Sequence, residues 1–427
     1  MSVGAIGAWL WLAGSSSGFV TVKQGHISRS ARAVRTSDVS SDGRYIVFES
    51  WARLVPADDN DGVDIYVLDR VTDRVTLETD SRIAEYSQPR ISGDGRYVVF
   101  EARFASASGE PRIQIVLRDR SSSTDKILTT AGTVSTSVGW SRSPDISDDG
   151  RVVVFSSAVT TLVDGPDANA ALEDVYAIDL ASGTTTRVSV TTAGVQPPRG
   201  TSILPTVSAD GRWVAFASTS PLDAAGRAVN DESPIRHVYL RDRSSGTTLR
   251  VSRSRRGAPL DGDSTLPALS GDGRFLAYAS DATNVVDNDS NRGSDLFLFD
   301  REKEETILVS RAANGAVAGG TSTNPSISFD GRFVAFQSDA ANLVCAGRCA
   351  AAHQDVNLLW DTFVFDRTKS KTVRISEDEL GGWMDWSAGI SIDGRGSVVA
   401  FSSRHPRDGS DRFDDVDLFV RALTLRR

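Results

Sequence analysis

The chain is organised around the stretch Ser92-Gly93-Asp94-Gly95-Arg96, which is followed at once by the apolar run Tyr-Val-Val-Phe at 97–100. The same pattern, Ser-x-Asp-Gly-Arg, occurs seven times between the two ends of the chain, at intervals of 52 to 63 residues. Its aspartates are Asp42, Asp94, Asp149, Asp210, Asp272, Asp330 and Asp393. A repeat of this length, in a chain that reads as strands and turns, indicates a ring of repeated β-sheets.

Each repeat divides into four strand-like pieces. A first piece such as Pro-Arg-Ile-Ser at 89–92 leads into Asp-Gly, which favours a tight hairpin because glycine accepts a positive φ and aspartate can accept hydrogen bonds from the backbone just ahead. The second piece is almost continuously apolar, as in Val-Val-Val-Phe at 152–155, and we expect it to be buried on both faces. A third and a fourth piece complete the unit.

The two ends of the chain predict how the ring closes. After the seventh hairpin there is room for a second and a third strand, near Phe401 and Phe419, but little for a fourth. Residues 19–28 read like a fourth strand and precede the first hairpin. We therefore predict an all-β, seven-bladed β-propeller of four-stranded blades over residues 19–427, with the last blade closed by an N-terminal strand.

The cadence Pro-x-Ile-Ser-x-Asp-Gly-Arg-x-Val-Ala-Phe-x-Ser resembles the WD-like repeats of TolB-type β-propellers, and it covers the chain from about Phe19 onward. The resemblance implies the propeller fold. It implies no single function, because this family includes periplasmic envelope proteins, propeller domains of peptidases and secreted propellers. The sequence is most similar to the stand-alone members, since it has neither the α/β domain of TolB nor a segment for a peptidase.

Composition and charge limit the classes of partner. The chain of 427 residues is 40% hydrophobic and 24% charged, which is typical of a globular protein, and its formal net charge of −9 disfavours nucleic acid. We expect a monomer without a membrane span. The apolar stretch 1–18 fits part of a secretory signal, although it lacks a basic start, and a truncated start or a buried N-terminal strand are the alternatives. An extracytoplasmic, periplasmic or secreted, location is the expectation.

The two cysteines, Cys345 and Cys349, lie close together in a loop rich in glycine and alanine. In an exported protein they would close a small disulfide, and two reduced thiols are the alternative.

The arginines of the repeated turn are expected to have a structural rather than a catalytic role, since an active site rarely needs seven copies of one residue. Each lies near an aspartate at the end of the third strand of its own repeat, such as Asp69 or Asp119, and we expect the two to form an ion pair.

One loop has the composition of a calcium site. Oxygen-bearing side chains recur through residues 287–295 around a glycine, and calcium needs six to eight hard oxygen ligands from a loop that can curl. The candidate ligands are Asp287, Asp289, Asn291 and Asp295. Asx turns ahead of a strand are the alternative explanation, so Ca²⁺ is a possible cofactor and none is certain.

A candidate binding face follows from the topology. If strands alternate in direction, the long connections between the second and third strands and between blades all lie at the end opposite the Asp-Gly-Arg turns. Tryptophan on loops anchors protein partners or stacks on sugars, although it also packs under its own loop. The candidate ligand-binding residues on this long-loop face are Trp51, Trp140, Trp383, Trp386, His353 and His405.

Two functions from different classes remain open. The first is a non-catalytic, exported scaffold that binds a protein or a glycan through the long-loop face. The alternative is a propeller enzyme, a glycoside hydrolase or lyase, with paired carboxylates at the central channel, roughly 5 to 9 Å apart. The sequence contains many acidic residues but does not single out such a pair, so no catalytic residue is assigned. A calcium-stabilised scaffold without a specific partner is a third possibility.

Overall fold

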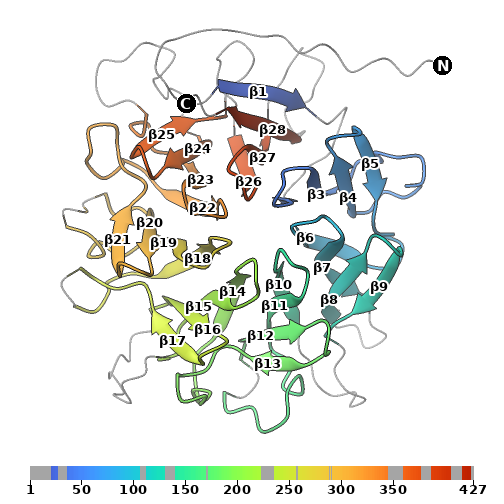
Figure 1. Ribbon diagram of the computed structural model, residues 1–427, viewed down its shortest axis with the longest axis horizontal. Helices are drawn as coiled ribbons and strands as arrows, with labels where there is room; N and C mark the ends of the chain where they lie inside the picture. The colour runs from blue at the N-terminus through green and yellow to red at the C-terminus, as the bar shows by residue number, and fades with distance from the viewer. Residues whose placement is uncertain are drawn as a thin grey trace.

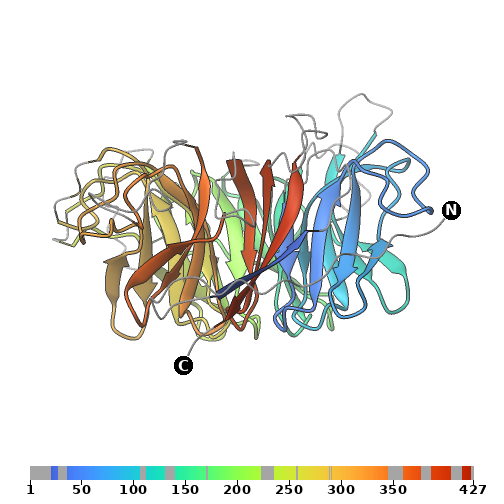
Figure 2. The same cartoon turned by 90° about the horizontal axis from the view of Figure 1, so that it is seen from above.

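The protein is a ring of blades around a central channel (Figure 1). The computed structural model describes residues 21–26, 36–105, 112–129, 140–169, 172–222, 235–255, 258–287, 289, 291–344, 359–376, 386–404 and 416–424. These residues form seven antiparallel sheets of four strands each, and the described part contains no helix. Figure 2 shows the ring edge-on, with the strands running between its two faces. The all-β, seven-bladed propeller is therefore confirmed.

The blades follow one another along the chain, each built outward from its innermost strand. Blade 1 comprises β2 (Ser37–Val39), β3 (Tyr45–Ser50), β4 (Asp64–Asp69) and β5 (Arg74–Leu77). Blade 2 comprises β6 (Glu85–Ile91), β7 (Tyr97–Phe104), β8 (Arg112–Asp119) and β9 (Thr124–Ile127). Blade 3 comprises β10 (Ser141–Ile146), β11 (Val152–Ser157), β12 (Asp174–Asp179) and β13 (Thr185–Arg187). Blades 4 and 5 comprise β14 (Ser202–Val207), β15 (Trp213–Ser218), β16 (His237–Asp242) and β17 (Thr247–Arg250), and β18 (Ser264–Leu269), β19 (Phe275–Ser280), β20 (Asp295–Asp300) and β21 (Glu305–Leu308). Blade 6 comprises β22 (Ser322–Ile327), β23 (Phe333–Ser338), β24 (Asp361–Asp366) and β25 (Lys371–Arg374), and blade 7 comprises β26 (Trp386–Ile392), β27 (Val398–Arg404), β28 (Asp417–Thr424) and β1 (Thr21–His26).

The N-terminal strand closes the ring, as the sequence predicts. β1 pairs antiparallel with β28, from Thr21 opposite Thr424 to His26 opposite Phe419, and so becomes the outermost strand of blade 7. Figure 1 shows this strand beside the C-terminal strand, although the two come from opposite ends of the chain. Pairing of this kind holds blades 7 and 1 side by side and covers the outer edge of β28.

The repeated turn has the same hydrogen bonds in most blades. In blade 2 the Ser92 hydroxyl donates to Asp94 Oδ1 at 2.7 Å, and Asp94 Oδ1 also accepts from the backbone N–H of Arg96 at 2.9 Å. Gly95 has a φ of +72° there, a conformation that L side chains rarely adopt. Serine, aspartate and glycine are therefore all required for the local geometry, which explains why the motif recurs.

The predicted ion pairs of the turn are present in five blades. In blade 2 the Arg96 guanidinium donates to both carboxylate oxygens of Asp119, at 3.2 and 2.8 Å, and these hydrogen bonds hold the pKa of Asp119 well below its usual range. The equivalent pairs are Arg44–Asp69, Arg212–Asp242, Arg274–Asp300 and Arg332–Asp366. Blade 3 differs, because Arg151 contacts Asp149 of its own turn at 3.8 Å.

The seventh copy of the motif is out of register, which corrects the sequence-based assignment of Asp393. Ile392 opposes Val399 in the ladder just as Ile327 opposes Val334, so Asp393 stands where the other blades have the motif serine. Its carboxylate accepts from the N–H of Val398 at 2.8 Å, and Gly396 takes the positive φ of +64°. The match at 391–395 thus lies two residues ahead of the true turn, and Ser391 is a channel residue.

The core lies between neighbouring blades. The second strands are buried on both faces, as predicted, and every residue of β11, β19 and β23 is buried. A phenylalanine or tyrosine of the second strand stacks on an aromatic ring of the third strand in most blades, at centroid distances near the 5.8 Å between Phe48 and Tyr66. Such contacts give a rigid wall against which the inner strands are positioned.

No helix in the described part of the chain has the length and apolar character needed to cross a membrane.

Candidate functional site

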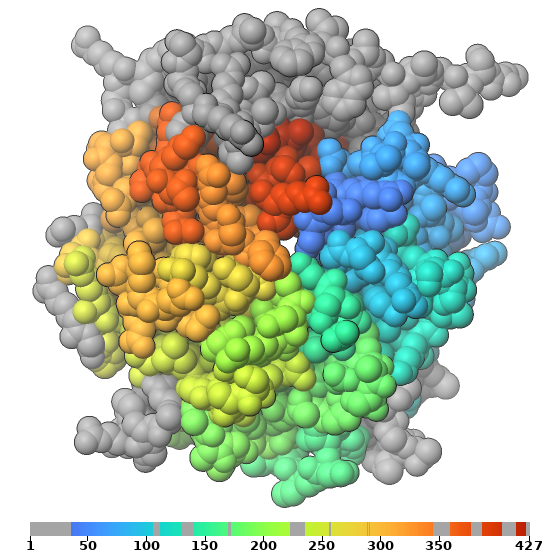
Figure 3. Space-filling view, in the orientation of Figure 1, coloured from blue at the N-terminus to red at the C-terminus, as the bar shows by residue number. Residues whose placement is uncertain are grey.

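The inner strands of the seven blades surround a central cavity of about 460 Å³. Figure 3 shows a narrow opening at the centre of the ring, where the inner ends of all the blades meet. Because side chains alternate along a strand, one position in each inner strand faces the cavity at its middle. The residues at this position are Asp38, Arg90, Asp145, Thr206, Ala268, Ser326 and Ser391 in blades 1 to 7.

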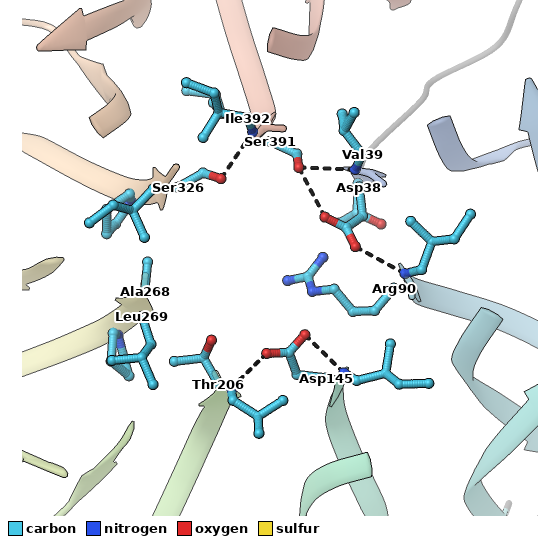
Figure 4. A pocket seen from close by; sticks show the side chains of 18 of the residues that line it. Asp38, Val39, Arg90, Asp145, Thr206, Ala268, Leu269, Ser326, Ser391 and Ile392 are labelled. Atoms are coloured by element: carbon cyan, nitrogen blue, oxygen red, sulfur yellow. Dashed lines mark hydrogen bonds between the residues drawn. The ribbon is translucent and has the colours of Figure 1, made fainter. Parts of the chain in front are cut away.

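Asp38 joins three blades through its carboxylate (Figure 4). Asp38 Oδ2 accepts from the backbone N–H of Ile91 in blade 2 at 3.0 Å, and Oδ1 accepts from the Ser391 hydroxyl of blade 7 at 2.9 Å. The Ser391 oxygen in turn accepts from the N–H of Val39 at 3.2 Å. These bonds fix the blade 7 to blade 1 junction from the inside, while β1 fixes it from the outside.

Asp145 has the same role between blades 3 and 4. Its Oδ2 accepts from the N–H of Val207 at 2.9 Å and its Oδ1 accepts from the N–H of Ile146 at 3.0 Å. Burial raises the pKa of Asp145 to about 6, against the lowering effect of the Arg90 charge and with a further rise from Asp38. A carboxyl group of this kind changes its charge close to neutral pH.

Arg90 points into the cavity between these two carboxylates (Figure 4). The side chain is partly buried, and its Nη1 donates a long hydrogen bond of 3.4 Å to the neighbouring carbonyl of Pro89. Among the residues that the structure describes, no carboxylate lies within ion-pair distance of its guanidinium. Arg90 therefore has donors to offer a ligand.

Two buried glutamates add to the charge on this side of the ring. The inner strands of blades 2 and 3 each carry a β-bulge, where Gln88 and Ser143 have φ values of +52°. Glu49 accepts from the N–H of Gln88 at 3.1 Å, and Glu101 accepts from the N–H of Ser143 at 2.7 Å. Burial raises the pKa of Glu101. Both carboxylates thus hold a bulge that borders the cavity.

A further acid of blade 3 borders the cavity at the end with the Asp-Gly turns. Asp148 accepts a hydrogen bond from the Ser41 hydroxyl of blade 1, and burial raises its pKa. The turn of blade 2 packs on the same residue, because the Gly93 N–H donates to the Asp148 carbonyl at 3.0 Å and a Cβ added at Gly93 would lie 2.9 Å from the Asp148 Cβ. Only glycine lets these two turns meet.

The cavity wall is different on the opposite side. Leu204 and Leu266 lie at the bulge positions of blades 4 and 5. Ala268 lies at the middle position of blade 5, and Val207 and Leu269 follow the middle positions of blades 4 and 5. We call Asp38, Arg90 and Asp145 of blades 1 to 3 the charged side, and Leu204, Leu266 and Ala268 of blades 4 and 5 the apolar side. One cavity thus presents fixed charges of both signs to one part of a ligand and hydrocarbon to another.

Trp140 is a predicted ligand-binding residue that the structure connects with the channel strand. It directly precedes β10, which carries Asp145, and 39% of its surface is exposed. Its indole N–H donates to Glu173 Oε1 at 3.1 Å, and the Arg142 guanidinium lies 5.0 Å from the centre of its ring. We call Trp140, Arg142 and Glu173 the blade 3 cluster.

The other predicted ligand residues are less informative. Trp51 follows β3 at the same end of the ring and is partly buried, and Trp386 begins β26. Three of the predicted residues, Trp383, His353 and His405, lie outside the described residues, as do the two cysteines. Ligand binding by this set stays a prediction.

The predicted calcium loop contains its own hydrogen bonds. The side-chain amide of Asn291 donates to Asp295 Oδ2 at 3.0 Å, while its oxygen accepts from the N–H of Gly293 at 3.0 Å. Burial raises the pKa of Asp295 to about 7 and raises that of Asp289, and Asp287 lies 3.7 Å from the Arg255 guanidinium. Within the described ranges no three side chains of His, Cys, Asp or Glu gather as a metal site. Calcium binding by Asp287, Asp289, Asn291 and Asp295 stays a prediction.

Sequence reasoning missed the charged side of the channel. Asp145 and Arg90 stand between a proline and an isoleucine in the first strand of their repeats, where the sequence pattern predicts a strand and no site. The available signal was a charged residue at one repeat position in three consecutive blades and never in the other four. Only the ring geometry shows that this position faces the axis.

Comparison with known proteins supports the fold alone. No protein-family model and no curated sequence matches the chain. Among solved structures, an oligogalacturonate lyase from Vibrio parahaemolyticus is 11% identical over 95% of this chain and 97% of its own, with a TM-score of 0.56. An oligogalacturonate lyase in complex with manganese is 14% identical over 95% and 96%, with a TM-score of 0.55. The β-propeller domain of the Trilobed protease from Pyrococcus furiosus is 13% identical over 92% and 93%, with a TM-score of 0.54. The propeller fold implied by the TolB-type resemblance is confirmed.

Proposed function

We propose that this protein is a non-catalytic, exported β-propeller that binds a protein or a glycan on its long-loop face. The observation that carries the proposal is the blade 3 cluster, in which an exposed tryptophan is held in place by a hydrogen bond and by a stacked arginine. Tryptophan and arginine dominate the binding energy of protein interfaces, and an aromatic ring also stacks on sugars. A side chain already fixed in one conformation loses little entropy on binding.

The state of the channel acids supports a binding role over a catalytic one. Both oxygens of Asp38 and both oxygens of Asp145 accept hydrogen bonds that join neighbouring blades or fix the inner strand. A carboxylate engaged in this way holds the ring together. It is less free to exchange a proton with a substrate than a carboxyl group with an open oxygen.

The test is a screen of peptide and glycan arrays with the purified protein, followed by affinity measurements on Trp140→Ala and Arg142→Ala. Removing a central aromatic anchor from an interface weakens binding by about 2 kcal/mol or more, which is roughly thirtyfold. Val71→Ala, at an exposed site in the turn between β4 and β5, is the control and should bind normally. Full binding by Trp140→Ala would place the ligand elsewhere.

The enzyme alternative keeps one specific observation in its favour. The pKa of Asp145 is raised to about 6, which suits a general acid or base near neutral pH, and Asp38 is close enough to contribute to that rise. Two of the solved structures with this fold are named as oligogalacturonate lyases. Incubation with oligogalacturonate, followed by the ultraviolet absorbance of unsaturated products, tests this function. Turnover that is lost in Asp145→Asn would replace the binding proposal.

Export is part of the proposal, and its support is the apolar stretch 1–18 in the sequence. Fractionation of expressing cells tests it, because the exported protein should be found in the periplasm or the medium, and retention with the cytoplasmic fraction would contradict it.

A further inference from the structure

We infer that the central channel is a second, separate site, which holds a small zwitterionic ligand: an α-amino acid with an apolar side chain. The ligand's carboxylate would meet Arg90, its ammonium group would meet Asp38 and Asp145, and its side chain would lie against the apolar side. This inference goes beyond the docking of a macromolecule on the long-loop face, because it uses different residues inside the ring.

Arg90 supplies the anion-binding group. The arginines of the repeated turns in blades 1 to 6 have carboxylate partners, as Arg44 does with Asp69 at 2.7 Å. Among the described residues, Arg90 instead has a long hydrogen bond to the Pro89 carbonyl and no carboxylate within ion-pair distance, although its side chain is partly buried and reaches into the cavity. A guanidinium group presents five N–H donors in a planar fork that matches a carboxylate. The open fork of Arg90 is therefore ready for a bidentate ligand carboxylate.

The two carboxylates supply a rigid partner for a cation. Each oxygen of Asp38 and of Asp145 accepts a hydrogen bond from its own blade or from a neighbouring blade, and Asp145 also accepts one from the Thr206 side chain, so both carboxylates are fixed in direction. A carboxylate oxygen has two lone pairs, so acceptor capacity remains for an ammonium group that enters from the cavity. Because both side chains are already held in place, binding costs little conformational entropy.

The combination of charges selects a zwitterion. A ligand that is only an anion would be attracted by Arg90 but repelled by two carboxylates. A ligand that is only a cation would be attracted by the two carboxylates, but it would be repelled by Arg90 and would leave that guanidinium without an anionic partner. A molecule with a carboxylate and an ammonium group on one carbon can satisfy both signs at once. The charged side presents them together, with Arg90 between Asp38 and Asp145 (Figure 4).

The apolar side and the size of the cavity limit the rest of the ligand. Leu204, Leu266 and Ala268 line the cavity in blades 4 and 5, where a polar substituent would lose its hydrogen bonds to water. The volume of about 460 Å³ is in the range of sites for small molecules. An amino acid of the size of leucine, valine, methionine or phenylalanine fits these limits.

The experiment is a calorimetric titration with L-leucine and with three analogues that each lack a part of it. Leucinamide lacks the carboxylate charge, 4-methylpentanoate lacks the amino group, and 3-methylbutylamine lacks the whole carboxyl group. We expect leucine to bind at least ~10-fold more tightly than each analogue, since loss of one charge-assisted contact costs about 1.5 kcal/mol or more.

Substitutions in the channel test which protein side chain binds each part of the ligand. Arg90→Gln should remove the preference for leucine over leucinamide, and Asp145→Asn should reduce the preference for leucine over 4-methylpentanoate. Ala268→Trp should fill the cavity and abolish binding of all four compounds. Arg74→Gln, an exposed arginine on β5, is the matched control and should behave as the unaltered protein does. Thermal melting of each variant shows that the ring is intact.

The outcomes separate this inference from the proposed function. Equal binding of leucine and leucinamide, or leucine binding that survives in Arg90→Gln, would overturn it. So would the absence of binding by leucine, valine, methionine and phenylalanine at about 10 mM, a concentration that would reveal even a millimolar site. Binding of a macromolecule that depends on Trp140 would leave the docking function standing in each of these cases.

Discussion

The charged side and the apolar side of the channel are built on the same backbone and differ in their side chains. Blade 3 and blade 5 both begin with a bulged strand whose middle residue faces the cavity, yet one carries Asp145 and the other Ala268. The repeated motif sets the turns and the buried strands, while the inward-facing position is free to vary. In such a ring, we therefore expect the residues that determine function at the positions that the repeat does not specify.

The largest expected effect comes from a deletion that should disrupt the charged side and the apolar side of the channel together. Deleting residues 19–28 removes β1, which pairs with β28 along six residues and holds blade 7 beside blade 1. The Asp38–Ser391 contact spans the same junction, so the channel should open there. We expect the cooperative thermal transition to be lost, as followed by circular dichroism. Deleting only residues 1–18 should leave that transition unchanged. A cooperative melt without residues 19–28 would contradict this closure.

The closure and the blades could be predicted from sequence because each follows from a local pattern. The hairpin needs Ser, Asp and Gly at fixed spacing. The last repeat lacks a fourth strand at the C-terminal end of the sequence, and a segment that reads like a fourth strand precedes the first hairpin. The same reliance on pattern produced the error at Asp393, where Ser-x-Asp-Gly-Arg occurs two residues away from the true turn. A motif shows that a turn is near, but only the ladder fixes its register.

The candidate site could not be predicted in the same way. Arg90 and Asp145 are 55 residues apart in sequence, and they meet only because the inner strands of successive blades converge on one axis. Trp140 is a candidate from sequence because tryptophan on a loop is unusual by itself, and its binding role stays a prediction. Its hydrogen bond to Glu173 and its contact with Arg142 depend on tertiary structure.

The next effect compares Asp38 of the charged side with Thr206, the residue at the same inward-facing position in blade 4. Asp38→Ala leaves the Ile91 N–H and the Ser391 hydroxyl without their acceptor, which should lower the free energy of unfolding by about 2–3 kcal/mol. Thr206→Ala, at the equivalent position in blade 4, should lower it by only about 1 kcal/mol, since the change removes one side-chain hydrogen bond to Asp145, which keeps its two backbone donors. Chemical denaturation measures both. Equal losses would mean that the charged side has no special role in joining the blades.

A smaller effect concerns pH. The pKa of Asp145 is raised to about 6 in the folded protein, so the folded state holds a proton that the unfolded state has released above its ordinary value near 4. The contribution of this group to stability is complete at low pH and is lost as the pH rises through 6. Relative to the unaltered protein, Asp145→Asn should gain about 2 kcal/mol between pH 4 and pH 8.

Asp295 sharpens this pH comparison because it is buried outside the channel and burial raises its pKa to about 7. The Asp295→Asn variant should show a gain of the same sign at slightly higher pH, but without a change in leucine binding. Denaturation curves at several pH values provide the measurement. For each variant, a difference in the free energy of unfolding from the unaltered protein that does not vary with pH would refute the pH effect assigned to that carboxyl group.

The smallest expected effect concerns calcium and the outer rim of blade 5. If Asp287, Asp289, Asn291 and Asp295 bind Ca²⁺ with the weak affinity of extracellular sites, near 1 mM, then about 1 mM calcium should stabilise the protein by roughly 0.4 kcal/mol. Asp289→Asn should remove the effect and a chelator should reverse it. An unchanged melting midpoint at higher calcium concentrations would exclude a metal site on this blade.

The most direct test of the account is a crystal structure of the protein soaked with L-leucine. The account predicts one leucine inside the ring, with its carboxylate on the Arg90 guanidinium, its ammonium group toward Asp38 and Asp145, and its side chain against Leu204 and Leu266. A channel that holds only water in those crystals, or a leucine whose charged groups face blades 4 and 5, would contradict the claim that the charged side recognises a ligand.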